Sequence, residues 1–83
     1  MEIKVLGAEG CPTCTNLQQM VINVLSELNI PAAVSKVVDV DEVLKYDVYS
    51  LPGLVINEQV MAKGRVPSKS EIINWVKEIA NLD

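Results

Sequence analysis

Both cysteines of the chain stand in one short stretch, Cys11-Pro12-Thr13-Cys14, between an apolar run and an amphipathic helical pattern. A bridge across two intervening residues removes little entropy from the unfolded chain, so it would do little to hold a fold together. The chain must therefore fold on an ordinary apolar core. With one Trp, two Tyr and no Phe, that core has to consist mainly of Val, Ile and Leu. We expect a single domain over residues 1–83, because a chain of 83 residues is too short for two cores.

Apolar periodicity predicts an alternation of strands and helices along the chain. The first helix opens at Pro12, carries an apolar stripe from Leu17 to Leu28, and is stopped by the segment 29–31. The order β-α-β-α-β-β-α, with a right-handed first crossover, predicts an α/β fold with a four-stranded mixed sheet flanked by helices. The other expected elements are strands at 3–6, 32–38, 54–56 and 59–62, a hairpin turn at 57–58, a short helix at 40–46 and a last helix after Ser68.

Two further helix starts carry the pattern of a capping box, in which an N-cap side chain is followed three residues later by Glu. The pairs are Asp39 with Glu42 and Ser68 with Glu71. In the short second helix we expect Val43 and Leu44 to face inward, and we expect Tyr46 and Tyr49 to be partly buried. The last helix presents one apolar face, made of Ile72, Trp75, Val76, Ile79 and Leu82.

The charge balance excludes one class of partner. A net charge of −4 and a pI near 4.6 argue against nucleic acid, because that binding depends on Lys and Arg neutralising phosphates. The apolar run at Ile3–Leu6 is too short for a signal peptide, and no stretch approaches the ~20 apolar residues of a membrane span. We therefore expect a cytoplasmic protein without a membrane partner. In that reducing compartment disulfides tend to be catalytic or transient.

The position of the cysteine pair indicates thiol–disulfide exchange. A sulfur at a helix N-terminus is held as thiolate by the backbone N–H groups and the helix dipole, and a second thiol nearby can resolve a mixed disulfide. Cys11 precedes the first helical turn and is expected to be exposed and to attack. Cys14 lies inside the turn and is expected to be less accessible and to resolve. No cofactor is needed for this chemistry, and we expect none.

With Ser50-Leu51-Pro52 about forty residues after Cys-Pro-Thr-Cys, the chain resembles the thioredoxin/glutaredoxin superfamily. It is most similar to the small redox-active disulfide proteins of archaea and bacteria, over essentially its whole length. The resemblance implies a minimal thioredoxin fold, a redox-active Cys11–Cys14 disulfide with Cys11 as nucleophile, and Pro52 as a cis-proline beside it. It also implies that Leu51, Pro52, Pro12 and Thr13 contact the substrate, with Leu51 offering its backbone to an added strand.

Differences from the superfamily narrow the expected substrate. Val5 stands where thioredoxins carry a buried Asp, so their proton relay does not transfer to this chain. Glutaredoxins place Tyr between the cysteines and a basic residue before them, where this chain has Thr13 and Glu9. We therefore expect protein disulfides as substrates rather than glutathione mixed disulfides. An upstream thiol or flavin-dependent reductase would recharge the dithiol, and we expect the protein to be a monomer.

The alternative function is soft-metal binding or metal transfer through the two thiolates of Cys11 and Cys14. Metal-transfer domains of that kind run β-α-β-β-α-β and typically have Met before the first cysteine, whereas this chain ends on a capped helix and has Gly10 there. Zinc takes four N or S ligands, and the chain has no His and no second cysteine pair, so we expect no metal site. A binding module that kept the fold without turnover is the third possibility, and retention of both cysteines argues against it.

Overall fold

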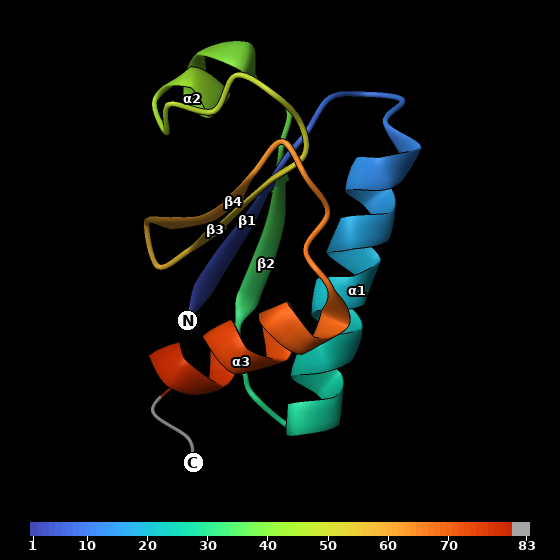
Figure 1. Ribbon diagram of the computed structural model, residues 1–83, viewed down its shortest axis with the longest axis vertical. Coiled ribbons are helices and arrows are strands. Elements are labelled where there is room, and N and C mark those ends of the chain that lie inside the picture. Colours follow the sequence, from blue (N-terminus) through green and yellow to red (C-terminus); the bar gives the residue numbers. More distant parts are fainter. Residues whose placement is uncertain (81–83) are drawn as a thin grey trace.

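A computed structural model describes residues 1–80 as a mixed sheet with helices on both sides (Figure 1). The strand order is β2-β1-β3-β4, with β1 and β2 parallel and the other neighbours antiparallel. The expected α/β fold and four-stranded mixed sheet are therefore confirmed. The elements are β1 (Glu2–Leu6), α1 (Pro12–Leu28), β2 (Ala33–Val37), α2 (Val40–Leu44), β3 (Gly53–Ile56), β4 (Gln59–Lys63) and α3 (Lys69–Ile79).

The long helix α1 begins and ends where its sequence requires. Pro12 occupies the first helical position, where its missing N–H would have had no partner in any case. Asn29 ends the helix in the left-handed conformation, with φ of 54°. The hairpin between β3 and β4 turns on Asn57 and Glu58, which both have positive φ, as a two-residue hairpin turn requires.

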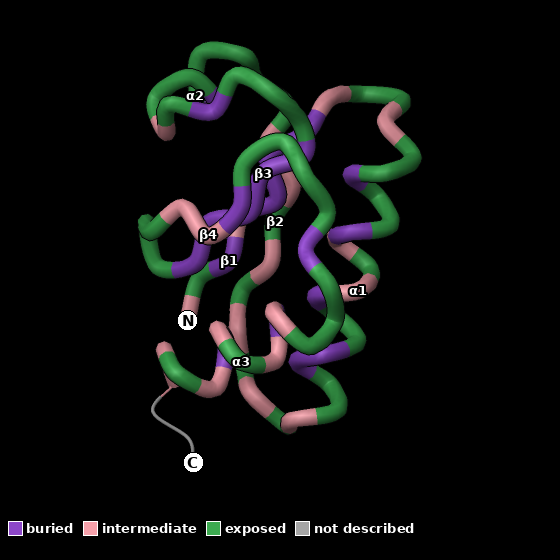
Figure 2. The backbone as a smooth tube through the Cα atoms, in the orientation of Figure 1, coloured by how far each residue is buried: buried purple, intermediate pink, exposed green. Residues whose placement is uncertain are grey.

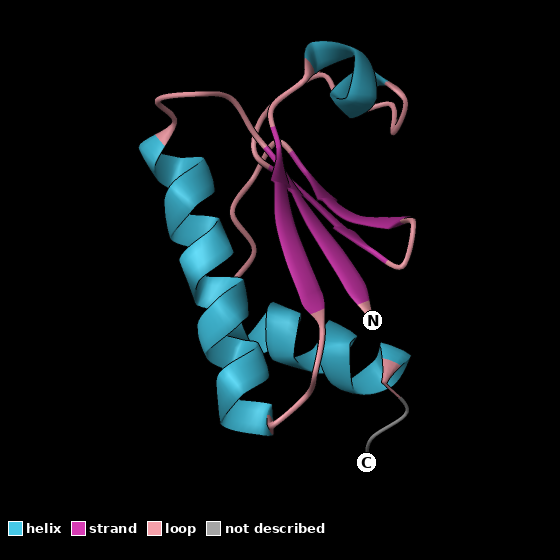
Figure 3. Cartoon of the chain, turned by 180° about the vertical axis from the view of Figure 1, so that it is seen from behind, coloured by secondary structure: helices cyan, strands magenta, loops and turns pink. Residues whose placement is uncertain are grey.

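Alternation along the strands gives the sheet two apolar faces of different size. The larger cluster packs under α1 and α3, and the smaller one packs under α2. Figure 2 shows β3, most of β1 and the sheet-facing side of α1 as buried, whereas β2 is intermediate to exposed. Figure 3 shows α1 and α3 lying together while α2 lies apart. The buried members of the larger cluster are Ile3, Val5, Leu17, Val21, Val24, Leu25, Leu54, Ile56, Ala62, Ile72 and Val76; those of the smaller one are Leu6, Val43, Val48 and Val55.

The last helix starts with the predicted capping box. The Ser68 hydroxyl accepts from the Glu71 N–H, and the Glu71 carboxylate accepts from the Ser68 N–H. Arg65 forms a bidentate pair with the same carboxylate. The Arg65 hydrogen bonds, and then that from the Ser68 backbone, lower the pKa of Glu71 to about 2. Ile72 and Val76 are buried as predicted, Trp75 and Ile79 are half-buried, and Leu82 lies outside the described residues.

The second helix differs from its prediction. It ends at Leu44 rather than at residue 46, and Leu44 is 42 % exposed instead of facing inward. A helix of only five residues can bury one position against the sheet, and Val43 takes it. Asp39 caps the helix as predicted, but the Glu42 carboxylate pairs with Lys45. Tyr49 is 79 % exposed, so its expected partial burial was wrong.

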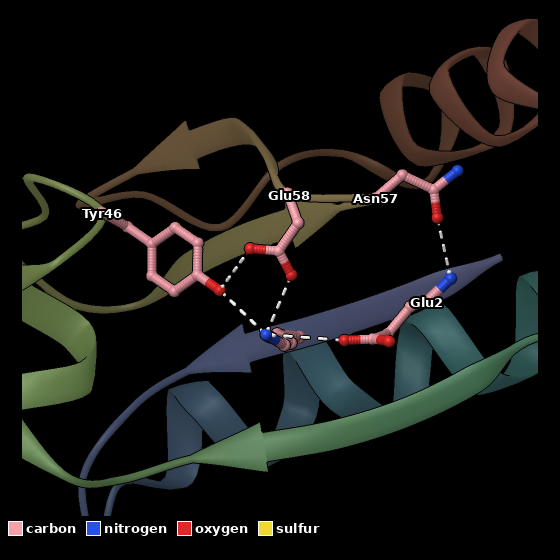
Figure 4. A network of polar contacts seen from close by, with 5 residues as sticks. Glu2, Tyr46, Asn57 and Glu58 are labelled. Carbon is pink, nitrogen blue, oxygen red and sulfur yellow. Dashed lines mark hydrogen bonds and ion pairs between the residues drawn. The ribbon is translucent and has the colours of Figure 1, made fainter.

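A polar network lies on the α2 side of the sheet, centred on Lys4 in β1 (Figure 4). Its ammonium donates to the Tyr46 hydroxyl at 2.8 Å and to Glu58 at 3.0 Å, and the Tyr46 hydroxyl donates to Glu58 at 2.9 Å. The hydrogen bond to Tyr46, followed by that to Glu58, raises the pKa of Lys4. The same contacts, Lys4 first, lower the pKa of Glu58. The network therefore places an ion pair over a part of the sheet that α2 is too short to cover.

None of the helices within residues 1–80 is both long enough and apolar enough to cross a membrane.

Candidate active site

The two cysteines lie at the N-terminus of α1 and are joined as a disulfide, with 5.3 Å between their Cα atoms. Cys11 is the N-cap residue, and its Sγ accepts the backbone N–H of Cys14 at 3.2 Å. The end of the helix therefore points an orphan donor at this sulfur, which favours negative charge on it. Cys11 is half-buried rather than fully exposed, whereas Cys14 is completely buried. The sequence expectation that Cys14 is the less accessible sulfur agrees with this geometry.

Gly7, at the end of β1, packs directly against the buried sulfur. A Cβ atom at Gly7 would lie 2.8 Å from the Cys14 Cβ and 2.9 Å from the Cys14 Sγ, closer than real contacts allow. Only glycine therefore lets the chain pass the dithiol at this point. This role could not be predicted from the sequence, because nothing there distinguishes Gly7 from the neighbouring loop residue Gly10.

Lys36, in β2, reaches the same place from the neighbouring strand. Its Cε lies 3.5 Å from the position that a Gly7 Cβ would take, and the Cys14 Sγ lies 2.9 Å from the same position. Its ammonium lies 3.3 Å from the Thr15 hydroxyl, and Lys36 forms no ion pair within residues 1–80. A role for Lys36 was not predicted from the sequence. The parallel pairing of β1 with β2 sets Lys36 opposite Val5, near the end of the strand leading to the cysteines, and that register is seen only in the structure.

Within residues 1–80, no buried acid or base accompanies the buried sulfur. Val5 is fully buried, and the part of the chain that the structure describes contains no buried polar or charged side chain. The buried acid of the superfamily therefore has no counterpart among the buried side chains of residues 1–80.

Leu51 and Pro52 lie at the same end of the sheet as the dithiol. The antiparallel register pairs Gly53 with Leu6, so the residues just before β3 face those just after β1. The Leu51–Pro52 peptide bond is cis, Pro52 is buried, and its carbonyl accepts the Gly64 N–H at 2.9 Å. Leu51 is 40 % exposed. The structure thus brings Leu51 and Pro52 to the end of the sheet where Gly7 contacts Cys14.

The other two residues implied by the resemblance, Pro12 and Thr13, are both exposed, in the first turn of α1 between the cysteines. For metal binding, the two cysteines would offer two thiolates once reduced. No group of three or more His, Cys, Asp or Glu residues with metal-ligand geometry occurs within residues 1–80.

An apolar pocket of about 190 Å³ adjoins the site. It lies between the loop after β1, the segment after β2, α2 and the chain leading to Pro52. Its lining residues are Gly7, Ala8, Val38, Val40, Val43, Leu44, Val48, Tyr49 and Leu51. Of these the sequence analysis had named only Leu51 as a site residue.

Comparison with known proteins agrees with this site. Residues 1–77 match the family described as the thioredoxin domain. The thioredoxin of Methanothermobacter thermautotrophicus is 35 % identical over 72 residues, covering 87 % of this chain and 92 % of the relative. The thioredoxin of Methanocaldococcus jannaschii is 34 % identical over 75 residues, covering 90 % and 85 %.

Solved structures show the same fold at lower identity. Thioredoxin 1 of Thermosipho africanus matches with a TM-score of 0.63 and 23 % identity, covering 98 % of this chain and 99 % of the other. Thioredoxin-2 of a malaria parasite matches with a TM-score of 0.67 and 23 % identity, covering 93 % and 81 %. Sequence and fold together show that this chain belongs to the thioredoxin family of thiol–disulfide oxidoreductases.

Proposed function

We propose that the protein reduces protein disulfides, with Cys11 as the attacking thiolate and Cys14 as the resolving thiol. The difference in accessibility between the two sulfurs carries this assignment. The Cys11 sulfur is reachable and accepts a helix N-terminal N–H, whereas Cys14 is fully buried behind it. A substrate disulfide can therefore meet only the first sulfur until a mixed disulfide has formed.

The reaction balances as two exchanges. The Cys11 thiolate attacks one substrate sulfur, and the other substrate sulfur leaves as a thiolate and takes up a proton. Cys14 then loses its proton and attacks the Cys11 sulfur, which closes the Cys11–Cys14 disulfide and releases the second substrate thiol. The substrate gains two electrons from the dithiol, one proton from Cys14 and one proton from solvent. An upstream thiol or flavin-dependent reductase must return the two electrons to the protein, and Cys14 takes up its proton again. We propose that the positive charge of Lys36, whose ammonium lies at the Thr15 hydroxyl in the first turn of α1, favours a thiolate at this pair.

Alkylation of the reduced protein tests the assignment of roles. Iodoacetamide at neutral pH should label Cys11 well before Cys14, as followed by peptide mass spectrometry. The Cys14→Ser variant should accumulate mixed disulfides with protein substrates through Cys11, whereas Cys11→Ser should accumulate none. Labelling of Cys14 first, or trapping by Cys11→Ser, would reverse the proposed roles.

The substrate is proposed to lie along the Leu51 backbone as an added strand. Exposure of Leu51 at the edge of the pocket and the position of Pro52 beyond Leu6 support this placement. In the trapped Cys14→Ser mixed disulfide, amide exchange at Leu51 should slow relative to the free protein. Unchanged exchange there would rule out strand addition.

We also propose that glutathione mixed disulfides are poor substrates. Glu9 is exposed in the loop before Cys11 and places a negative charge where an anionic tripeptide would approach. Reduction of a glutathionylated peptide should therefore be slower than reduction of a protein disulfide under the same conditions. Efficient deglutathionylation with glutathione as the sole donor would contradict this preference.

A further inference from the structure

One cation near the dithiol has a single polar partner. The Lys36 ammonium lies 3.3 Å from the Thr15 hydroxyl, and within residues 1–80 it forms no other hydrogen bond and no ion pair. A lysine side chain has many rotamers, so its charge is poorly placed unless a partner fixes it. For Lys36 that partner is one hydroxyl on another element, so the position of the charge depends on Thr15.

The Lys36 side chain passes from the sheet to the helix across Gly7. Lys36 pairs with Val5 in the register of β1 and β2, and Val5 belongs to the cluster under α1. The Lys36 Cε lies 3.5 Å from the position that a Gly7 Cβ would take, on the path toward α1. Because Gly7 has no side chain, this path is open, and the ammonium reaches the turn that begins between the two cysteines.

The Thr15 hydroxyl is itself held in one orientation. It donates to the Cys11 carbonyl at 3.2 Å, and a β-branched side chain has few rotamers in a helix. A hydroxyl has one proton and two lone pairs, so with its proton on the Cys11 carbonyl the oxygen is free to accept from Lys36. The contacts therefore run from the Lys36 ammonium through Thr15 to the residue that caps the helix.

No acid near Thr15 on α1 competes with it for the ammonium. The only charged residue of this helix is Glu27, which is paired with Lys69. At about 1.5 Å per residue, Glu27 lies roughly 18 Å along the helix from Thr15. The helix therefore offers the Lys36 ammonium a neutral hydroxyl and no carboxylate.

The other charged groups at this end of the sheet lie on neighbouring segments. Glu9 is exposed in the loop before Cys11, and Asp39 is exposed after β2, where its carboxylate caps α2. Lys4 lies on the opposite face of the sheet, in the network of Figure 4. An ammonium released from Thr15 would be drawn toward these carboxylates and away from the start of α1.

We propose that Thr15 is a positioning residue, whose hydroxyl holds the Lys36 ammonium at the start of α1 so that this charge favours the Cys11 thiolate of the reduced protein. The inference rests on the proposed disulfide reduction and on the proposed role of Lys36 in it. It assigns part of the control over thiolate formation to a residue outside the Cys-Pro-Thr-Cys stretch. Such a residue changes how the reaction rate depends on pH, whereas a purely structural residue changes only stability.

The test follows iodoacetamide alkylation of Cys11 in the reduced protein between about pH 5 and pH 9. Thr15→Val keeps the shape of the side chain and removes the hydroxyl. It should slow alkylation at pH 7 about two- to threefold and move the midpoint of the rate curve to higher pH. Thr15→Ser retains a hydroxyl and should restore the native curve.

A matched control and a stability measurement accompany these variants. Asn16→Val places the same side chain at the next exposed position of α1, which makes no hydrogen bond to Lys36 within residues 1–80, and should keep the native curve. Urea unfolding of the oxidised proteins shows whether each variant folds. If Thr15→Val does not fold, Thr15→Ala gives the same comparison with a better helix former.

Thr15 also bonds Cys11 directly, so a double-mutant cycle with Lys36→Met separates the two routes. If Thr15 acts through Lys36, adding Thr15→Val to Lys36→Met slows alkylation no further. The effect of Thr15→Val alone should shrink in high salt, as expected of a charge that has moved. Slowing of the same size in both backgrounds would overturn the proposal and assign the effect to the Cys11 carbonyl.

The remaining outcomes separate this proposal from the proposed function. A native pH curve in Thr15→Val, together with reduction of protein disulfides, would overturn positioning by Thr15 and leave the proposed function standing. A native protein that is alkylated at Cys11 but reduces no protein disulfide would overturn the proposed function. In that case the alkylation cycle would still decide whether Thr15 places the charge of Lys36.

Discussion

The two faces of the sheet differ in how many apolar residues they bury. The face under α1 and α3 holds eleven buried residues in one cluster, with half-buried hydrophobic residues closing its margins. The face under α2 holds four, and beyond them it is covered by the polar network around Lys4. The first face supplies most of the stability. The second is thin enough to leave an open apolar pocket beside the dithiol.

The largest expected difference between the faces comes from one substitution made on each. Leu54→Ala empties a fully buried site in the larger cluster and should lower the free energy of unfolding by about 2–5 kcal/mol. Leu44→Ala, on α2, removes a side chain that is 42 % exposed and should change it by about 0.5 kcal/mol or less. Urea unfolding of both variants measures the contrast. Equal losses would mean that the α2 face carries as much stability as the other.

The next largest effect on stability is expected at Gly7, which packs against the buried Cys14 of the dithiol. Gly7→Ala puts a methyl group against Cys14 and should lower stability by about 1–3 kcal/mol, because neither backbone nor buried sulfur can move freely. It should also alter the rate at which Cys14 resolves a trapped mixed disulfide. Gly10→Asn is the matched control, since Gly10 has φ of 72°, which Asn tolerates, and a Cβ there would meet nothing within 4 Å. If Gly7→Ala behaved like this control, the close approach to Cys14 would be wrong.

Two half-buried lysines, Lys4 in β1 and Lys36 in β2, allow the effects of a positive charge in two places to be compared. The Lys36 Cε and the Cys14 Sγ both lie near the position that a Gly7 Cβ would take, and Lys36 forms no ion pair within residues 1–80, whereas Lys4 is bonded to Tyr46 and Glu58. Removing a positive charge near a thiolate disfavours it, so Lys36→Met should slow alkylation at pH 7 about three- to tenfold, and less so in high salt. Lys4→Met should leave alkylation unchanged and lower the melting temperature.

Measured alkylation rates and melting curves of the two methionine variants decide this prediction. If alkylation slowed in Lys4→Met and kept its native rate in Lys36→Met, the charge that favours the thiolate would lie on the other face of the sheet.

The smallest effect concerns the cap of α3 and appears only in acid. Because the folded-state pKa of Glu71 is about 2, below that of an unfolded Glu, the carboxylate adds stability that is complete above about pH 4.3. This contribution is lost as the pH falls toward 2. Glu71→Gln should therefore lower the urea midpoint at pH 7 and narrow its difference from the native protein at pH 2. Glu78→Gln, an exposed acid of the same helix, should lower the midpoint less at pH 7.

Local rules were sufficient for most of the fold. The capping box at Ser68, the stop after Leu28 and the Asn57–Glu58 turn depend on residues a few positions apart, so their elements appear where they were predicted. The short helix α2 was the exception. With only five residues, its inward face depends on what the sheet offers, and the sheet accommodated Val43 but not Leu44.

The sequence by itself determined the redox chemistry, because two cysteines at a helix start need no distant residue to define it. Only the tertiary structure decided what surrounds that pair. Gly7, Lys36 and the pocket lining come from separate segments, and strand pairing brings them to one end of the sheet. Contacts of that kind follow from register and packing, and the pattern along a single chain contains neither.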